Sequence, residues 1–183
     1  MQGATLSQFD QQVQVCFEIF EKKTLDYGTA WRILRPSSLT DQIFIKAKRI
    51  RNIQELEEQK VNENQVSEFV GIANYCIMAL LQLKLDKEHP IRLENVEVFN
   101  LYNGEVVLIK ELLSNKNHDY GEAWRDMRVS SMTDLILMKL LRIKEIEDND
   151  GKTIISEGLD ANYMDIFNYA VFCLILLEEN KAQ

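Results

Sequence analysis

The sequence predicts an all-α protein built from two tandem, homologous helical bundles that are related by a pseudo-twofold axis. Three observations favour this fold class: a repeat with a period of 93 residues, apolar side chains at helical spacing, and only 7 Gly and 2 Pro among 183 residues. The low Gly and Pro content favours long helices over a turn-rich β fold, and 46% apolar residues are enough for a core. No segment alternates apolar and polar side chains as a half-buried strand does.

The repeat is clearest around a motif that occurs twice, LDYGTAW at 25–31 and HDYGEAW at 118–124. A shift of 93 residues aligns 26–50 with 119–143 and gives 15 identities in 25 positions, where chance gives about one or two. After a one-residue insertion, the pair Asn-Tyr at 74–75 aligns with the pair at 168–169. We therefore divide the chain into a first repeat, 1–88, and a second repeat, 89–183, with the boundary in the charged stretch LDKEHP.

Each repeat is predicted to form a helix, an irregular loop, a second helix, a turn and a third helix. Ser38 and Ser131 are expected to cap the second helices, with Asp41 and Asp134 three residues later as in a capping box. The third helices are apolar over much of their circumference, so we expect them at the centre of the fold. The expected helices are 7–23, 38–58 and 64–85 in the first repeat, and 131–148 and 160–179 in the second.

A polar pocket is predicted between the second and third helices of the second repeat. Lys139 and Arg142 share one face of an otherwise apolar helix, and Asp165 and Asn168 share one face of the next. A buried cation is costly unless it is paired, so we expect these two faces to meet. The ligand candidates are Lys139, Arg142, Arg125, Tyr120, Trp124 and Asn168, and the metal candidates are Asp119, Asp134, Glu157 and Asp165.

The first repeat has counterparts of these residues but fewer acids. Gly71 aligns with Asp165, and Val66 aligns with Asp160, so the first repeat is the degenerate copy and the second is the expected working site. A purely structural interpretation also stays open, because Lys and Arg can extend to the surface and an aromatic side chain can seal a bundle. The counterparts are Asp26, Tyr27, Trp31, Arg32, Asp41, Lys46, Arg49 and Asn74.

Composition limits the partners and the compartment. A net charge of −8 argues against general binding to nucleic-acid backbones, because such binding needs clustered cations. The N-terminal stretch MQGATLSQFDQQ predicts no secretion signal, and the longest apolar stretch, 171–177, is far shorter than the ~20 residues that cross a bilayer. Cys16, Cys76 and Cys173 lie far apart in apolar helical patterns, which is typical of reduced core residues in a cytoplasmic protein.

Three stretches carry a resemblance to a known family: K-N-x-D-Y-G-x-A-W from residue 116, T-D-L-I-L-x-K-x-x-R-I from 133, and D-I-F-N-Y-A from 165. In this order they resemble the nucleotide modification associated domain, type one, which was earlier catalogued as a domain of unknown function. The resemblance covers both repeats, most strongly 116–143 and 157–172. It implies an association with nucleotides and gives no mechanism.

A more distant similarity is to all-α NTP pyrophosphohydrolases of the MazG kind, which hold magnesium with E-x-x-E on one helix and E-x-x-D on the next. This chain departs from that pattern, because its acidic pairs do not fall on two facing helices. The pairs are Glu55 with Glu58, Glu145 with Asp148, and Glu157 with Asp160.

Two main interpretations of function follow. In the first, the protein binds or hydrolyses a (deoxy)nucleotide in a polar pocket between helices, with cations on phosphate, carboxylates on Mg²⁺ and an aromatic ring on the base. In the second, it is a non-catalytic interaction or structural module whose buried ion network serves folding specificity. In a third interpretation, the protein is a subunit that acts only when it is paired with another protein. We expect a nucleotide and a second copy of the chain as partners, and we expect no association with a membrane. No residue is assigned a catalytic role.

Overall fold

A computed structural model describes the chain except residues 1, 57–63, 86–87, 153–156 and 182–183, and the side chains of 2–4, 116–120 and 181 also lie outside the described set. The described residues form helices and no strand, so the predicted all-α fold with tandem helical units is confirmed. The elements are α1 (Gln2–Tyr27), η1 (Ala30–Ile33), α2 (Pro36–Glu55), α3 (Gln65–Lys84), α4 (Asn95–Tyr120), η2 (Ala123–Asp126), α5 (Val129–Asp148) and α6 (Leu159–Lys181), where η marks a 3₁₀-helix.

Every element of the first repeat recurs in the second at the shift found in the sequence. The helices α4, η2 and α5 begin 93 residues after α1, η1 and α2, and α6 begins 94 residues after α3. In the DYG motif, Asp26 and Tyr27 still belong to α1, and the helix ends at Gly28 with a φ of +64°. Gly121 ends α4 in the same way with a φ of +70°. This left-handed backbone favours glycine, which explains its place in both copies.

The N-caps of the second helices lie three residues earlier than predicted, so Ser38 and Ser131 do not occupy these positions. Arg35 and Arg128 occupy the cap positions with extended backbone and no side-chain cap hydrogen bond. Pro36 begins α2, and proline suits this position because its fixed φ is helical and its missing N–H would have no partner there.

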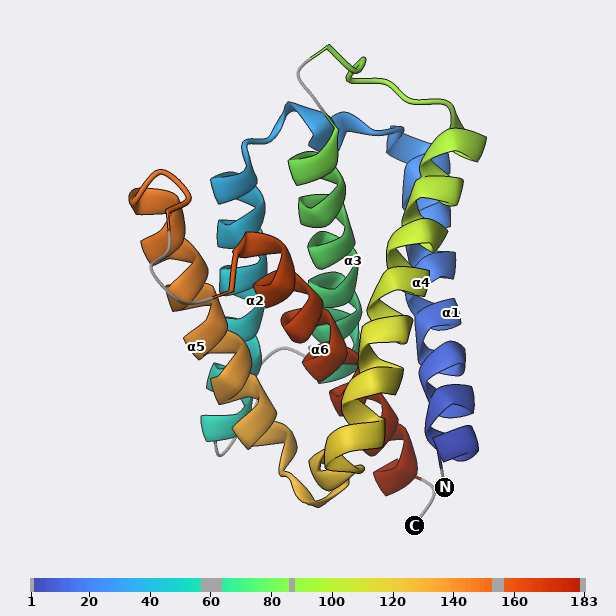
Figure 1. The fold of residues 1–183 in the computed structure, drawn as a ribbon, viewed down its shortest axis with the longest axis vertical. Helices are drawn as coiled ribbons and strands as arrows, with labels where there is room; N and C mark the ends of the chain where they lie inside the picture. The colour runs from blue at the N-terminus through green and yellow to red at the C-terminus, as the bar shows by residue number, and fades with distance from the viewer. Residues whose placement is uncertain (1, 57–63, 86–87, 153–156, 182–183) are drawn as a thin grey trace.

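Like helices of the two repeats lie side by side and run in opposite directions, as Figure 1 shows for α1 with α4, α2 with α5, and α3 with α6. In addition α1 packs against α6, and α4 packs reciprocally against α3. An axis of twofold type produces such reciprocal contacts. Two ion pairs between α2 and α5 repeat the relation: Lys144 Nζ lies 2.5 Å from Asp41 Oδ1, and Arg51 Nη1 lies 3.5 Å from Asp134 Oδ1.

The two repeats share one hydrophobic core, with α3 and α6 at its centre as predicted. Cys16, Cys76 and Cys173 are buried and free, and burial raises the pKa of each thiol above its ordinary value. The segments Gln65–Lys84 and Leu159–Asn180 are long and apolar enough to cross a membrane by length and composition alone. However, 61% of the apolar window of each is buried inside the protein, as in the core helices of soluble proteins.

Candidate functional site

The predicted contact between the two polar helix faces of the second repeat is present. Lys139, on α5, donates from Nζ to Oδ2 of Asp165, on α6, at 2.6 Å. The two side chains are only 19% and 13% exposed. Because an unpaired charge at this depth is costly, each side chain makes the burial of the other tolerable. A role of this pair in ligand binding stays a prediction.

The first repeat neutralises its equivalent lysine from a different position. Glu68, on α3, accepts hydrogen bonds from Lys46 Nζ at 3.2 Å and from Arg49 Nη1 at 2.9 Å, and its side chain is 8% exposed. The sequence comparison placed no acid opposite Lys46, because Gly71 aligns with Asp165. The signal for Glu68 was its helical spacing, since it lies three residues before Gly71 and therefore on the same helix face.

The acid has therefore moved by one helical turn between the repeats. Glu68 aligns with Asn162, whereas Asp165 aligns with Gly71. A Cβ atom on Gly71 would lie 2.7 Å from Cε of Lys46, so the lysine stem runs across the glycine on its way to Glu68. A countercharge needs only to come within reach of the lysine, whereas a catalytic or metal-binding carboxylate has to keep its place.

The other cation of the predicted pocket, Arg142, is 40% exposed and donates from Nη1 to Glu145 of its own helix at 3.1 Å. Two further ligand and metal candidates, Tyr120 and Asp119, have side chains outside the described residues. Their places in the pocket therefore stay predictions.

The predicted metal ligands are not brought together among the described residues. Asp134 is exposed and pairs with Arg51, Glu157 is exposed, and Asp165 is paired with Lys139. No three His, Cys, Asp or Glu side chains in the described part of the chain form a group that could hold a metal ion. A role for Mg²⁺ stays a prediction.

Trp124 and Arg125 form a stacked pair in η2. The guanidinium carbon of Arg125 lies 4.5 Å from the ring centroid of Trp124, and the indole stacks on Phe172 of α6 with 4.2 Å between centroids. The guanidinium also joins η2 to α1 and α6 through four side chains, so its charge is already countered by two acids. It donates to Thr5 at 2.7 Å, Gln8 at 2.6 Å, Glu122 at 2.9 Å and Glu179 at 3.2 Å.

The aligned asparagines, Asn74 and Asn168, are both buried but differ in hydrogen bonding. Asn74 donates to the backbone carbonyl of Cys16 at 2.9 Å and accepts from the hydroxyl of Tyr102 at 2.8 Å. Asn168 Oδ1 is buried with no hydrogen-bond partner among the described residues. The position equivalent to Tyr102 is Phe9, which has no hydroxyl to donate. Among the described residues, the buried carbonyl oxygen of Asn168, a predicted ligand residue, thus has no hydrogen-bond donor.

The first copy of the DYG motif has its acid and phenol in solvent. Asp26 and Tyr27 are exposed at the end of α1, and Tyr27 retains 71% of its accessible surface. Trp31 is half-buried, whereas Arg32 is buried and donates from Nη1 to Gln82 Oε1 at 2.5 Å.

A cleft of about 670 Å³ lies where the ends of the two repeats meet, and we call it the interrepeat cleft. It is formed by the end of α2, the beginning of α3, η2 with the beginning of α5, and the end of α6. Its volume falls in the range of small-molecule sites, as does its mixture of apolar and polar walls. The apolar lining is Ile53, Met127, Val129, Leu176 and Leu177, and the polar lining is Gln54, Gln65, Arg125, Arg128, Ser130 and Asn180.

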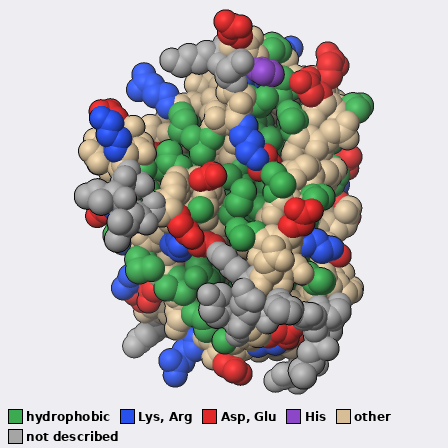
Figure 2. Space-filling model, viewed as in Figure 1, with side chains coloured by type: hydrophobic (Ala, Val, Ile, Leu, Met, Phe, Trp, Pro, Cys, Tyr) green, Lys and Arg blue, Asp and Glu red, His purple; other side chains and the backbone are tan. Residues whose placement is uncertain are grey.

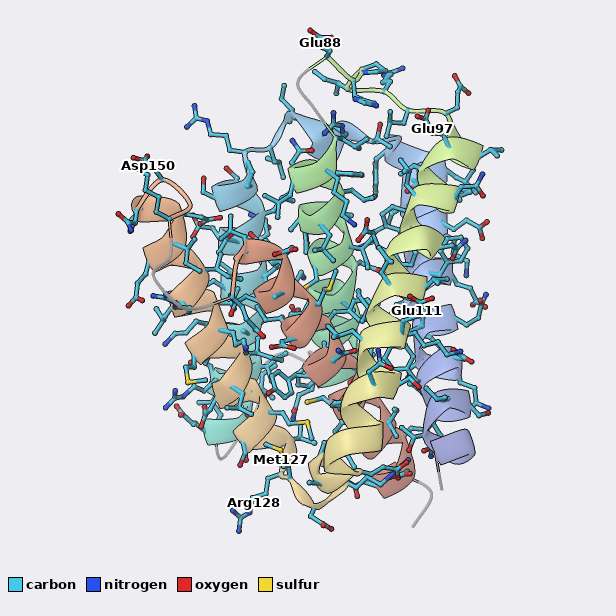
Figure 3. The ribbon with its side chains drawn as sticks, viewed as in Figure 1. Glu88, Glu97, Glu111, Met127, Arg128 and Asp150 are labelled. Carbon is cyan, nitrogen blue, oxygen red and sulfur yellow. The ribbon has the colours of Figure 1, made fainter. Side chains whose placement is uncertain are left out.

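Arg128 gives the interrepeat cleft an uncommitted positive charge. It is exposed at the beginning of α5 and has no ion-pair or hydrogen-bond partner for its side chain among the described residues. Figure 3 shows Met127 and Arg128 at this end of α5, with Arg128 extending away from the helices. Figure 2 shows acidic and basic side chains interspersed over the viewed face, around hydrophobic side chains near its middle.

The two ends of the α2–α5 contact, which the pseudo-twofold axis relates, differ in charge at one aligned position. Gln54 of the cleft donates to Thr133 Oγ1 at 3.2 Å, whereas its equivalent, Glu147, accepts from Thr40 Oγ1 at 2.7 Å. Glu147 also lies 3.4 Å from the hydroxyl of Tyr163, which donates to it. Burial raises the pKa of Glu147 above its ordinary value, and Asp41 adds to this effect.

A second cavity, of about 440 Å³, lies at the end of α1 in the first repeat, and we call it the Trp31 cavity. It is formed by the end of α1, η1 and the middle of α3. Its walls are mostly apolar and aromatic. They consist of Phe20, Lys23, Thr24, Tyr27, Gly28, Ala30, Trp31, Ile33, Leu34, Tyr75 and Met78.

Comparison with known proteins identifies the family. The sequence profile of nucleotide modification associated domain 1 matches two segments, 23–83 and 116–177, which together span more than half of the chain. The chain belongs to this family. Each match begins just before a DYG motif and ends within the third helix of a repeat, so one family unit corresponds to one repeat. No curated protein and no solved structure matches the chain, and the similarity to MazG-like pyrophosphohydrolases is not confirmed.

Sequence reasoning missed the residues that line the interrepeat cleft, apart from Arg125. Arg128 was visible only as an identity with Arg35, at a position expected to be in a loop. Gln54 and Gln65 gave no signal, because polar residues at the ends of helices are ordinary on any surface. The two family segments meet at this cleft only through the packing of one repeat on the other.

Proposed function

We propose that this protein binds a nucleotide in the interrepeat cleft. The observation that carries the proposal is the combination, in a chain of this family, of a cleft of about 670 Å³ with Arg128 at the beginning of α5, whose side chain has no partner among the described residues. Among the described residues, those that line the cleft include no carboxylate, histidine or cysteine, so the proposal concerns binding.

The phosphate would lie at the beginning of α5. The first N–H groups of a helix have no partner within the helix and favour anions. The N-cap residue, Arg128, makes no side-chain cap hydrogen bond, and Ser130 lines the cleft within the first turn of α5. Arg128 can add a charge-assisted hydrogen bond there. Arg125 is a positioning residue in this scheme, because Glu122 and Glu179 already take its charge.

The base would lie over the apolar floor formed by Ile53, Leu176 and Leu177. Gln54 donates to Gln65 at 3.2 Å at the wall and to Thr133 at 3.2 Å, which uses both of its amide hydrogens. Gln54 therefore keeps its carbonyl oxygen, and Gln65 keeps its amide N–H groups, for base edges. The equivalent end of the molecule has Glu147 where the cleft has Gln54. A carboxylate there would repel a phosphate, so we assign one site to the chain.

A structural role is favoured instead for the ion pairs that the sequence singled out. Lys139 with Asp165, and Lys46 with Glu68, are satisfied within their own repeats. The displacement of the acid by one helical turn keeps charge balance while changing geometry. We propose that these pairs fix the packing of the second helix of each repeat on the third, as buried ion pairs do where they specify an arrangement.

The test is isothermal titration calorimetry of the four deoxynucleoside monophosphates against the parent chain and the Arg128→Gln variant. We expect the variant to bind at least tenfold more weakly, since a hydrogen bond to a charged group contributes about 1.5–3 kcal/mol. Arg128 is exposed and has no side-chain partner in the described part of the chain, so the variant should unfold at the parent's temperature.

The matched control is Arg35→Gln, which changes the aligned arginine at the beginning of α2. It should leave binding unchanged. Equal losses from the two variants would show that the effect is general electrostatics and not the interrepeat cleft. Absence of heat with all four nucleotides in the parent chain would overturn the proposal.

A further inference from the structure

The Trp31 cavity lies at the opposite end of the molecule from the interrepeat cleft. In Figure 1 the end of α1 and η1 lie at the top, whereas α5 begins at the bottom. The cavity is rich in aromatic walls, with Phe20, Tyr27, Trp31 and Tyr75 among its lining. Aromatic walls favour a flat apolar ring, which they bind through offset-stacked and edge-to-face contacts.

Three polar groups of the cavity have no side-chain partner among the described residues. The ammonium of Lys23 is exposed at its rim, and the hydroxyl of Thr24 belongs to a side chain that is only 3% exposed. The indole N–H of Trp31 is buried without an acceptor. The indole N–H of Trp124 in the second repeat is also buried without an acceptor among the described residues, so this feature is common to both repeats and does not by itself distinguish the Trp31 cavity. One cation and two hydrogen-bonding groups in an aromatic cavity suit a ring that carries an anionic group.

In the second repeat, the equivalent tryptophan, Trp124, has an aromatic ring stacked on its face. Phe172 stacks on Trp124 with an interplanar angle of 5°. The position equivalent to Phe172 in the first repeat is Met78, which lines the Trp31 cavity. One repeat thus supplies its own aromatic ring to the tryptophan, and the other has a narrower, flexible side chain beside an open space.

We propose that the Trp31 cavity binds a small molecule with a flat aromatic ring and one anionic group. The ring lies against Trp31 as Phe172 lies against Trp124, and the anionic group is held at the rim by Lys23. Two sources share this chemistry, an aromatic carboxylic acid and a nucleoside monophosphate. This site is separate from the interrepeat cleft, and the proposal does not rest on nucleotide binding there.

The two tryptophans of the chain allow the two ends to be observed separately. In a Trp124→Phe variant the remaining indole, Trp31, lines the cavity, and in a Trp31→Phe variant the remaining indole lies under Arg125 of the interrepeat cleft. We would titrate both with nicotinate and with thymidine monophosphate and record tryptophan fluorescence. We expect at least one of the two ligands to quench the fluorescence of Trp31 saturably. Nicotinate should leave the fluorescence of Trp124 unchanged. Nicotinate alone would indicate a carboxylic acid, and thymidine monophosphate alone a nucleotide. Quenching of Trp31 by neither would overturn the proposal.

The decisive variant is Met78→Phe, which copies the second repeat. A protein that already holds Phe at the aligned position should fold with it, and the new ring should fill the cavity and abolish quenching of Trp31 by the ligand. Unchanged affinity in this variant would overturn the proposal. Thymidine monophosphate binding that survives Met78→Phe but is lost in Arg128→Gln belongs to the interrepeat cleft and would count against the Trp31 cavity as its site.

Lys23→Gln provides a test that does not depend on packing. The substitution should lower the affinity for nicotinate about threefold or more, as expected for an exposed charge pair. It should leave the affinity for the neutral nicotinamide unchanged. The matched control is Lys22→Gln, because Lys22 is the exposed neighbour that does not line the cavity. Equal effects of both variants on nicotinate, or none from Lys23→Gln, would contradict the assigned role of Lys23.

Discussion

Asp165 neutralises Lys139 from a position one helical turn beyond that from which Glu68 neutralises Lys46 in the aligned repeat. Both acids are largely buried, and both reach the equivalent lysine from the third helix of their own repeat. A lysine stem is long and flexible enough to meet an acid on either of two successive turns. Charge balance at this depth is therefore preserved although neither acid keeps its place.

Removing the acid of the second repeat should destabilise the protein. In Asp165→Asn the mostly buried Lys139 loses its countercharge, and we expect a cost of about 1–3 kcal/mol, below the value for a fully buried pair because both side chains retain some exposure. Urea denaturation measures the loss. The control is Asp134→Asn, whose exposed pair with Arg51 should contribute less than about 1 kcal/mol.

The double variant Asn162→Glu with Asp165→Gly transplants the arrangement of the first repeat into the second. It should recover much of the stability lost in Asp165→Asn, less about 1 kcal/mol for glycine inside a helix. No recovery at all would mean that the geometry of Asp165 matters beyond its charge, and would reopen its role as a ligand residue.

Replacing Tyr102 by Phe should leave the carbonyl oxygen of Asn74 without a donor. Asn74 would then resemble Asn168 of the second repeat. The variant removes the hydroxyl that donates to Asn74 Oδ1 and leaves this acceptor buried, which should cost about 1–3 kcal/mol. For a chain of this size each kcal/mol lowers the melting temperature by about 2–4 °C. A double-mutant cycle with Asn74→Ala should give a coupling energy above about 0.5 kcal/mol, and additive effects would refute the hydrogen bond.

The stability of the protein should decline with pH because of Glu147. Burial raises the pKa of this carboxyl, so the folded state holds its proton more tightly than the unfolded chain does. The resulting stabilisation is present below the unfolded-state pKa and is lost as pH rises through the folded-state pKa. Glu147→Gln, which copies Gln54 of the first repeat, should remove this decline and be more stable than the parent at neutral pH.

The measurement is denaturation of parent and variant at a series of pH values from mildly acidic to neutral. The converse variant, Gln54→Glu, should introduce a decline of the same sign at the other end of the α2–α5 contact, because it places a carboxyl at the aligned position. Parallel stability curves for the parent and Glu147→Gln would show that Glu147 titrates equally in the folded and unfolded states.

Much of the fold followed from local patterns. The 15 identities between 26–50 and 119–143 predict the tandem units, and the apolar circumference of the third helices predicts their central place. The predicted helix starts at Ser38 and Ser131 were wrong, because a serine pattern suggested a cap where the backbone had already become helical at Pro36 and Val129. Cap positions depend on backbone conformation as much as on residue type.

The sequence by itself determined the fold class, the repeat, the family and the contact of Lys139 with Asp165, since each depends on spacing along one or two neighbouring helices. Only the tertiary structure decided that Glu68 serves Lys46, and that the end of α2, the beginning of α5 and the end of α6 enclose one cleft. Periodicity states which face of a helix is buried, but the partner of that face depends on how distant segments pack. The reciprocal packing of the two repeats therefore creates the interrepeat cleft, which neither repeat forms alone, whereas the Trp31 cavity lies within the first repeat.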